Sequence, residues 1–198
     1  MCAVAEKTLL TPDVLLSLPE QKGYELVDGE IVERKVSVLS SWVGGEIFGR
    51  IRDFCSGRDL GWAFPADNGF QCFPNRPRTV RRPDVSFVKA GRITWDDVNH
   101  GWLGIVPDLV VEVLSPNDLA YEVDEKIEMF RKAGVPLIWI VNPVVRTVRL
   151  IRGVGPEATL REGDTISGED VIPGFACPVA SIFPPRPPAP MAEVAPGA

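Results

Sequence analysis

Residues that bind zinc are scarce in this sequence. Its 198 residues include four cysteines, with no C-x-x-C pair among them, and a single histidine. A structural zinc site needs about four such ligands at short spacings, so a zinc-based fold is not expected. His100 falls in an expected loop, where a lone histidine is usually solvated rather than catalytic. The cysteines are expected to be reduced and mostly buried: Cys2, Cys55, Cys72 and Cys177.

Long apolar runs and an excess of positive charge are also lacking. No apolar stretch reaches the roughly 20 residues that a membrane helix needs, and the N-terminus has neither the basic nor the apolar region of a secretory signal. We therefore expect a cytoplasmic protein with no membrane partner. The net charge of −6 argues against strong non-specific binding to nucleic acid, although it does not exclude a local basic cleft.

What the chain does have is an ordinary globular composition, with 45% hydrophobic and 24% charged residues. Its length suits one domain with a proper core and is too short for two. We expect a single α/β domain over residues 10–183. It is preceded by a flexible N-terminus over residues 1–9 and followed by a proline-rich, disordered tail over residues 184–198.

The most informative stretch spans residues 107–143. It predicts a buried strand from Leu109 to Leu114, an amphipathic helix, and a second buried strand. Asn117 or Asp118 is the expected N-cap of the helix, and Gly134 is expected to end it. Such a strand-helix-strand unit packs the helix back over the sheet.

Glu112 is out of place at the middle of the apolar strand. Fully burying an unpaired carboxylate costs several kcal/mol, so Glu112 needs a partner or a metal. The expected helix has an apolar stripe formed by Val123, Ile127, Phe130 and Ala133. Lys126 lies on or beside this stripe and could approach Glu112.

Two Pro-Asp pairs precede strands, and either aspartate could join Glu112 in a site. Asp108 is four residues before Glu112 on one strand, which separates them by roughly 13 Å in any extended chain. That distance is too long for both to ligate one cation at about 2.0 to 2.6 Å. Asp84 lies on a different strand, where cross-strand neighbours have Cβ atoms about 5 Å apart. Asp84 is therefore the better partner, and Asp108 is expected to cap its strand.

Asp84, Glu112 and Lys126 together suggest phosphodiester chemistry. Two carboxylates, waters and a backbone carbonyl suit Mg²⁺. Partial burial can lower the pKa of a lysine enough for it to hold or deprotonate a water molecule. The alternative is a buried ion pair between Glu112 and Lys126, with Asp84 as a turn residue at the strand end.

Other segments surround these residues. Asp28-Gly29 lies between two alternating runs and predicts a β-hairpin. A helix is expected from about Ser37 to Phe54, and a final loop or turn over Val171 to Phe183. The densest basic cluster follows Pro74 and contains Arg76, Arg78, Arg81 and Arg82. These arginines either contact phosphates or belong to a solvated loop that balances an acidic surface.

Four motifs in this order carry a family resemblance: GYELVDGEIVE, RRPDVSFV, PDLVVEVLSPND and DEKIEMFRKAGVPLIWIVNP. With them the chain resembles the Uma-type restriction endonuclease family of the PD-(D/E)xK nuclease superfamily, over roughly Leu10 to Phe183. The resemblance implies a restriction-endonuclease-like core, with a central mixed β-sheet flanked by helices and an N-terminal hairpin. It also implies an endonuclease that hydrolyses DNA with Mg²⁺, or Mn²⁺ in its place.

The resemblance assigns roles to individual residues. Asp84, Glu112 and the carbonyl of Val113 would hold the metal, and Lys126 would orient or activate the attacking water. Glu25 matches a motif glutamate and is either a third acidic group near the site or an outward-facing strand residue.

The chain departs from the family pattern in three places. Leu114 stands in the third slot of the (D/E)xK signature, because the lysine has moved to the helix. Phe130 replaces a frequent tyrosine, and the helix from Ser37 lacks a frequent histidine at its start. These departures leave open a non-catalytic DNA-binding or accessory module with a nuclease fold. Hydrolysis of RNA in place of DNA is a further alternative. A homodimer would cut both DNA strands most easily.

Overall fold

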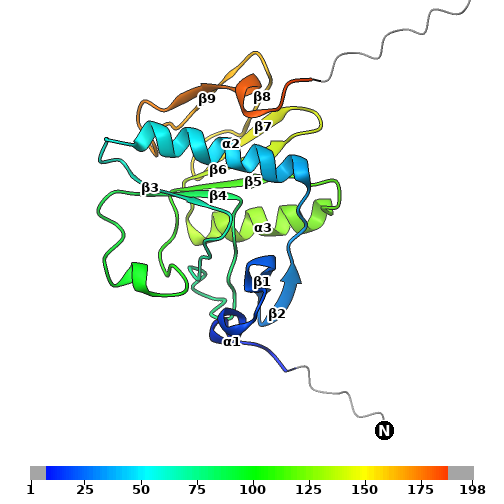
Figure 1. Cartoon of the computed structure of the whole chain (residues 1–198), viewed down its shortest axis with the longest axis vertical. Coiled ribbons are helices and arrows are strands. Elements are labelled where there is room, and N and C mark those ends of the chain that lie inside the picture. The colour runs from blue at the N-terminus through cyan, green and yellow to red at the C-terminus, as the bar shows by residue number, and fades with distance from the viewer. Residues whose placement is uncertain (1–7, 187–198) are drawn as a thin grey trace, which may run out of the picture.

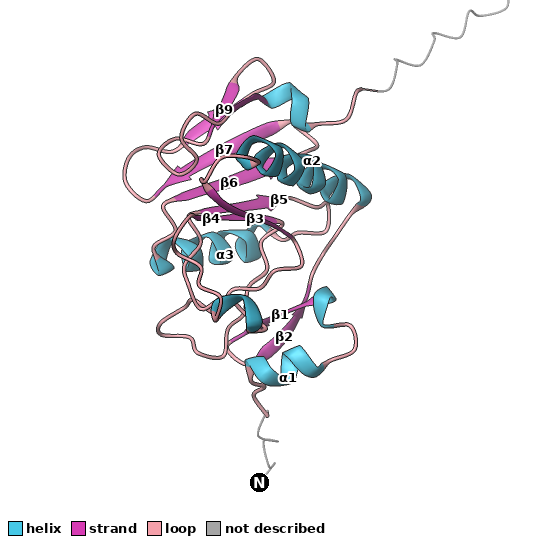
Figure 2. Cartoon of the chain, turned by 60° about the vertical axis from the view of Figure 1, so that its left-hand side comes forward, coloured by secondary structure: helices cyan, strands magenta, loops and turns pink. Residues whose placement is uncertain are grey.

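The computed structural model describes residues 8–186 and is built around a mixed β-sheet (Figure 1). The strands of this sheet are β3 (Gly61–Pro65), β4 (Val85–Lys89), β5 (Leu109–Val113), β6 (Leu137–Asn142), β7 (Thr147–Arg152) and β8 (Ala158–Leu160). They lie side by side in that order. Two long helices, α2 (Val38–Cys55) and α3 (Ala120–Ala133), cover opposite faces of the sheet (Figures 1 and 2). The expected fold class is confirmed.

Strands β5 and β6 are the parallel pair of the sheet, and α3 connects them. The other neighbouring strands are antiparallel. This arrangement is the strand-helix-strand unit that the sequence predicts. It brings α3 back over the sheet beside the strand that carries Glu112.

The two faces of the sheet bury different sets of side chains. Leu109, Val111 and Val113 of β5 belong to the apolar core that packs under α2. Val110 belongs to the second core, which includes residues of α3. Because side chains alternate along a strand, Glu112 lies on the same face as Val110 and points toward α3.

The N-terminal hairpin consists of β1 (Tyr24–Val27) and β2 (Glu30–Glu33), which pair only with each other as a two-stranded sheet. Asp28 and Gly29 have φ values of 50° and 88°, as the tight turn of a two-residue hairpin loop requires. The predicted hairpin is confirmed.

The hairpin joins the rest of the domain through backbone bonds, buried apolar side chains and the polar contacts of Glu25. Leu26 forms an isolated bridge with Val80, with N–O distances of 3.0 and 2.8 Å. These two residues and Leu15 of the short helix α1 (Pro12–Ser17) form a separate small core. The hairpin is therefore docked beside the main sheet and is not part of it.

Helix α3 begins one or two residues later than predicted. Leu119 is the N-cap and has no side-chain cap, whereas Asp118 accepts a hydrogen bond of 2.7 Å from the backbone N–H of Ser115. The predicted capping by Asn117 or Asp118 is wrong, because Asp118 closes the preceding turn instead. Gly134 ends the helix with a φ of 93°, as predicted.

The C-terminal region, predicted as a final loop or turn over Val171 to Phe183, contains a turn and also a short strand. It contains strand β10 (Ala176–Pro178), which pairs with β9 (Thr165–Ser167), and a 3-10 turn over Val179–Ile182. Other 3-10 turns lie at Gln21–Gly23 and Asp97–Asn99.

Most of the expected flexible N-terminus and nearly all of the expected proline-rich tail lie outside the described residues. Within residues 8–186, none of the helices has the length and apolar character needed to cross a bilayer.

Candidate active site

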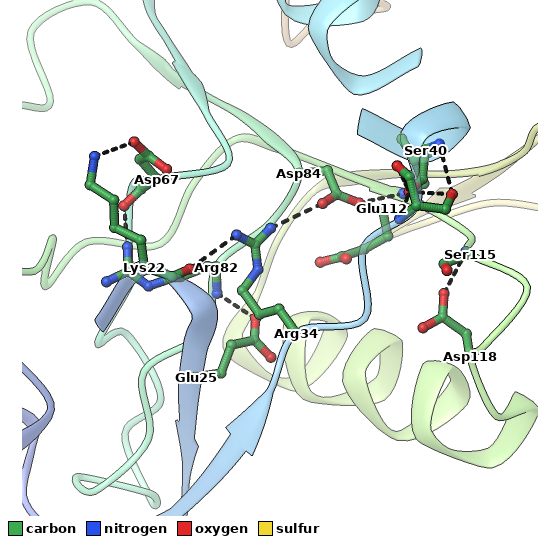
Figure 3. Close-up of polar contacts among 12 residues, drawn as sticks. Lys22, Glu25, Arg34, Ser40, Asp67, Arg82, Asp84, Glu112, Ser115 and Asp118 are labelled. Atoms are coloured by element: carbon green, nitrogen blue, oxygen red, sulfur yellow. Dashed lines mark hydrogen bonds and ion pairs between the residues drawn. The ribbon is translucent and has the colours of Figure 1, made fainter. Parts of the chain in front are cut away.

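The predicted site residues lie in a cleft of about 280 Å³ between the hairpin, α3 and the C-terminal end of β5. Asp84, Glu112, Val113, Lys126 and Glu25 all line it. They come from four separate parts of the chain: the start of β4, the end of β5, the middle of α3, and β1. Figure 3 shows the polar contacts on this side of the molecule.

Asp84 precedes β4 and lies beside the end of β5. Val85 pairs with Val111, so the antiparallel register continued by one residue places Asp84 opposite Glu112. One carboxylate oxygen of Asp84, Oδ2, accepts a hydrogen bond of 2.7 Å from the backbone N–H of Val113. The other, Oδ1, accepts one of 3.1 Å from Nη2 of Arg34. The cross-strand placement that favoured Asp84 over Asp108 is therefore what the structure has.

Glu112 and Lys126 form an ion pair across the cleft. Nζ of Lys126 lies 2.9 Å from Oε2 of Glu112 and 3.5 Å from the carbonyl oxygen of Arg82. The second carboxylate oxygen of Glu112, Oε1, is buried and has no hydrogen-bond partner among the described residues. A buried acceptor without a partner is costly, and a bound cation or water would satisfy it.

Glu25 belongs to the interior of the site. Its side chain is almost fully buried, and the outward-facing alternative is wrong. Its carboxylate lies 3.0 Å from Nζ of Lys126 and 2.9 Å from Nη1 of Arg81, and it accepts a hydrogen bond of 2.6 Å from the backbone N–H of Arg82. Both oxygens of Glu25 are therefore occupied, and its contacts fix the position of Lys126.

The three carboxylates titrate differently. Burial raises the pKa of Glu112 to about 8, and Lys126 only partly opposes this shift. Burial also raises the pKa of Asp84, against the charge of Lys126 and the hydrogen bond from Val113. For Glu25 the same effect of burial is outweighed by Lys126 and Arg81, which lower its pKa to about 2. Asp84 and Glu112 are thus the carboxylates that additional positive charge would stabilise.

Lys126 does not titrate as the sequence suggested. Burial alone would lower its pKa, but the nearby carboxylates of Glu112 and Glu25 outweigh burial and raise it. The expectation of a lysine with a lowered pKa is wrong, because the sequence did not show that two carboxylates would flank it. Lys126 is an ammonium group that can donate hydrogen bonds, and it is not poised to remove a proton.

The four clustered arginines fall into two groups. Arg81 and Arg82 are buried, so both predictions, contacts with phosphate and a solvated loop, are wrong for these two residues. Arg81 pairs with Glu25, and Arg82 donates to the carbonyl oxygens of Tyr24 and Asp67 and lies over the ring of Trp102. Arg78 is exposed and Arg76 is partly exposed, so these two stay candidates for contacts with a nucleic acid.

Arg34 is a site residue that the sequence did not reveal. It follows β2 directly, and its side chain is only 12% exposed because the guanidinium reaches Asp84 (Figure 3). In the sequence it lies in a charged run after the hairpin, which is typical of a solvated segment. Its partner lies 50 residues away, and no local pattern reports that contact.

The residues present fit a divalent cation with oxygen ligands. Glu112 offers a buried oxygen without a partner, Asp84 lies opposite it, and the backbone of Val113 is adjacent to both. Over residues 8–186, no group of three or more His, Cys, Asp or Glu side chains is arranged to hold a metal. The protein would therefore supply few ligands and leave the others to water, which suits Mg²⁺ better than zinc.

A solved protein structure shares this fold. A crystal structure from Anabaena variabilis ATCC 29413, described as a "putative nuclease belonging to DUF820", has a TM-score of 0.72 and 21% sequence identity. The alignment covers 87% of this chain and 97% of that one, and it shows that the two share a fold. No curated protein matches the sequence.

The family model named Uma2, described as "Putative restriction endonuclease", matches residues 12–180. This range contains the hairpin, both long helices, the central sheet and every residue of the cleft described above. The resemblance carried by the four sequence motifs is therefore confirmed, and the chain belongs to the Uma2 family.

Proposed function

We propose that this protein is a metal-dependent endonuclease that hydrolyses DNA phosphodiester bonds in the cleft between the hairpin and α3. The observation that carries the proposal is the pairing of Asp84 with Glu112 beside the ammonium group of Lys126. Both carboxylates have a raised pKa, and one keeps a buried oxygen without a partner. Such a group favours a divalent cation, and the family description supports DNA cleavage.

Asp84, Glu112 and the carbonyl of Val113 would hold Mg²⁺ or Mn²⁺. The cation would polarise the scissile phosphate and stabilise the leaving oxygen. Lys126 would donate hydrogen bonds to the attacking water and to the phosphoryl oxygens, where negative charge develops. Glu25 would act as a positioning residue, because it holds Lys126 and is itself held by Arg81.

Arg76 and Arg78 are the remaining candidates for contacts with the DNA backbone. Arg76 lies 3.7 Å from Glu125, which lines the cleft, so this part of the basic loop adjoins the site. Phosphate contacts of this kind position the duplex and weaken as salt increases.

A second candidate function is a non-catalytic DNA-binding or accessory module. In one respect the cleft favours a role in which it does not receive DNA, because acidic side chains outnumber basic ones in its lining. Seven are acidic (Glu25, Glu33, Asp84, Glu112, Asp118, Glu122 and Glu125) and four are basic (Arg34, Lys35, Arg81 and Lys126). A cleft with this balance attracts cations more strongly than it attracts DNA.

Cleavage of supercoiled plasmid separates the two functions. The wild-type protein is incubated with Mg²⁺, Mn²⁺ or EDTA, and nicked and linear products are separated on a gel. Cleavage that requires the metal and disappears in Glu112→Gln supports the nuclease. Linear product without accumulation of nicked circles would indicate that two active sites act together, as in a homodimer.

Glu128→Gln is the matched control, because Glu128 lies on the exposed face of α3 and pairs only with surface residues. It should cut like the wild type. Absence of cleavage with either metal, combined with retained DNA binding, would reject the nuclease in favour of the accessory module. RNA of the same sequence, tested in parallel, shows which nucleic acid is preferred.

A further inference from the structure

Arg34 contacts the carboxylate oxygen of Asp84 that does not accept the hydrogen bond from Val113. Its guanidinium lies 3.1 Å from Oδ1, and the other oxygen of Asp84 already accepts the hydrogen bond from Val113. Both oxygens of Asp84 therefore have a partner, one of them a cation. A divalent ion bound to Oδ1 would meet the positive charge of Arg34 at close range.

Of the basic residues around the carboxylates, Arg34 is the one held least firmly by acidic groups. Lys126 contacts both Glu112 and Glu25, and Arg81 pairs with Glu25 deep in the interior. Arg34 contacts one carboxylate, and its other side-chain bond is a long one of 3.4 Å to the carbonyl oxygen of Lys22. Its backbone is fixed by a hydrogen bond of 2.9 Å to Gly23, so the guanidinium can leave Asp84 without moving the strand.

The charge balance of the site also favours movement of Arg34 away from Asp84 when a metal and a substrate bind. Three carboxylates and three basic groups are in contact there: Asp84, Glu112 and Glu25 with Arg34, Lys126 and Arg81. The set is balanced when all three carboxylates are ionised. A divalent cation then adds two positive charges, and a scissile phosphodiester brings one negative charge. An arginine that moves from Asp84 to the phosphate relieves the repulsion at the carboxylate and places its charge next to the new anion.

We infer that Arg34 is a positioning residue that exchanges partners during the reaction cycle. In the metal-free protein it neutralises Asp84. When a divalent cation binds, Arg34 releases Asp84 and binds the non-bridging oxygens of the substrate phosphate, which it can reach because it lines the same cleft. This inference rests on the proposed nuclease function and adds the residue that couples metal binding to substrate binding.

The first test is the affinity for Mn²⁺ without DNA, measured by titration calorimetry. Because Arg34 competes with the ion, Arg34→Gln should bind Mn²⁺ about three- to tenfold more tightly than the wild type. Arg92→Gln is a matched control, since Arg92 also pairs with an aspartate, Asp108, at 2.5 Å and does not line the cleft. Its affinity for Mn²⁺ should equal that of the wild type.

The second test is the affinity for a short fluorescent DNA duplex, measured by anisotropy with Ca²⁺ or with EDTA. Arg34→Gln should lose about tenfold in affinity with Ca²⁺, when Arg34 is free to bind phosphate, and little with EDTA, when Arg34 is engaged by Asp84. Arg34→Lys keeps the charge without the planar fork, so it should fall between the two proteins in both tests. If Arg34→Gln does not fold, Arg34→Lys takes its place in both tests.

The outcomes separate the inference from the function on which it rests. Equal or weaker Mn²⁺ binding by folded Arg34→Gln overturns the exchange and leaves the metal site intact. A loss of DNA affinity that is the same with Ca²⁺ and EDTA also overturns it, because Arg34 would then be an ordinary DNA contact. Failure of both the wild type and the variant to bind Mn²⁺, with or without DNA, overturns the inference together with the metal-dependent function.

Discussion

The two ends of strand β5 carry acidic groups in very different states. At its start, Asp108 accepts hydrogen bonds from the backbone of Lys89 at 2.9 Å and from Arg92 at 2.5 Å. At its end, Glu112 has a partner for one oxygen and none for the other among the described residues, and burial raises its pKa to about 8. Both bonds to Asp108 go to its Oδ2. Among the described residues, Asp108 has no buried oxygen without a partner, whereas Glu112 has one.

The comparison is instructive because both ends involve a Pro-Asp pair that precedes a strand. Asp84 and Asp108 look alike in the sequence, yet Asp108 stabilises a loop, whereas Asp84 lies opposite a second carboxylate. An acidic residue becomes a candidate for catalysis when its neighbours leave its charge only partly compensated. The predictions below test this difference between the two ends, starting with the largest expected effect.

Exchanging each aspartate for asparagine should separate the two ends most clearly. Asp84→Asn removes a proposed metal ligand and should reduce Mn²⁺-dependent DNA cleavage by about 100-fold or more. Asp108→Asn should cut within a few-fold of the wild type, because Asp108 holds Arg92 and the end of β4, away from the cleft. Initial cleavage rates at saturating Mn²⁺ measure both effects. An equal loss in the two variants would contradict the placement of the active site at the end of β5.

Glu25→Gln should destabilise the protein, because Glu25 is a structural carboxylate among the site residues at the end of β5. Removing its charge leaves Lys126 with one carboxylate and Arg81 with none, which should lower the free energy of unfolding by about 3 kcal/mol at pH 7. Because the folded-state pKa of about 2 lies below the usual 4.5, Glu25 contributes fully above pH 4.5, and this contribution is lost as the pH falls through 2.

Urea unfolding at several pH values measures this effect. The difference between the wild type and Glu25→Gln should shrink steadily below pH 4.5. Glu33→Gln is the control, because Glu33 lies on the exposed strand β2, and its variant should unfold like the wild type throughout. A pH-independent difference for Glu25→Gln would contradict the buried, ionised state of this residue.

Glu112→Gln should show the opposite dependence on pH. The folded-state pKa of about 8 lies above the usual 4.5, so the folded protein holds this proton more tightly, and ionisation destabilises it as the pH rises between these values. The variant should therefore gain a few kcal/mol in free energy of unfolding relative to the wild type as the pH rises from 4.5 to 8 in EDTA. Urea unfolding at both pH values tests this, with Glu128→Gln expected to show no such change.

Local patterns and chain geometry predicted much of this site. Glu112 was conspicuous because it interrupts an apolar strand, and Lys126 because it lies beside an apolar helical stripe. Strand spacing then favoured Asp84 over Asp108. These inferences worked because they depend on periodicity and distance along one element or between neighbouring strands.

The misassigned residues depend on contacts between distant segments. Arg81 and Arg82 belong to a run that reads as solvated or phosphate-binding, yet the hairpin and the loop at Asp67 bury them. Arg34 was missed for the same reason, because only the folded hairpin brings it to Asp84. The pKa of Lys126 was predicted in the wrong direction, since a sequence does not show how many carboxylates surround a lysine.

The docking of the hairpin beside the main sheet has a consequence for how the site behaves as an ensemble. Glu25 lies on the hairpin and Arg34 directly follows it. Asp84, Glu112 and Lys126 belong to the main sheet and α3. The two parts are connected by the backbone bridge between Leu26 and Val80, by a small apolar cluster, and by the ion pairs of Glu25 and Arg34. Sub-global opening at this seam would dismantle the site while the central sheet stays folded. Such opening would make the fraction of molecules with a complete site depend on the contacts of the hairpin as well as on the stability of the whole domain.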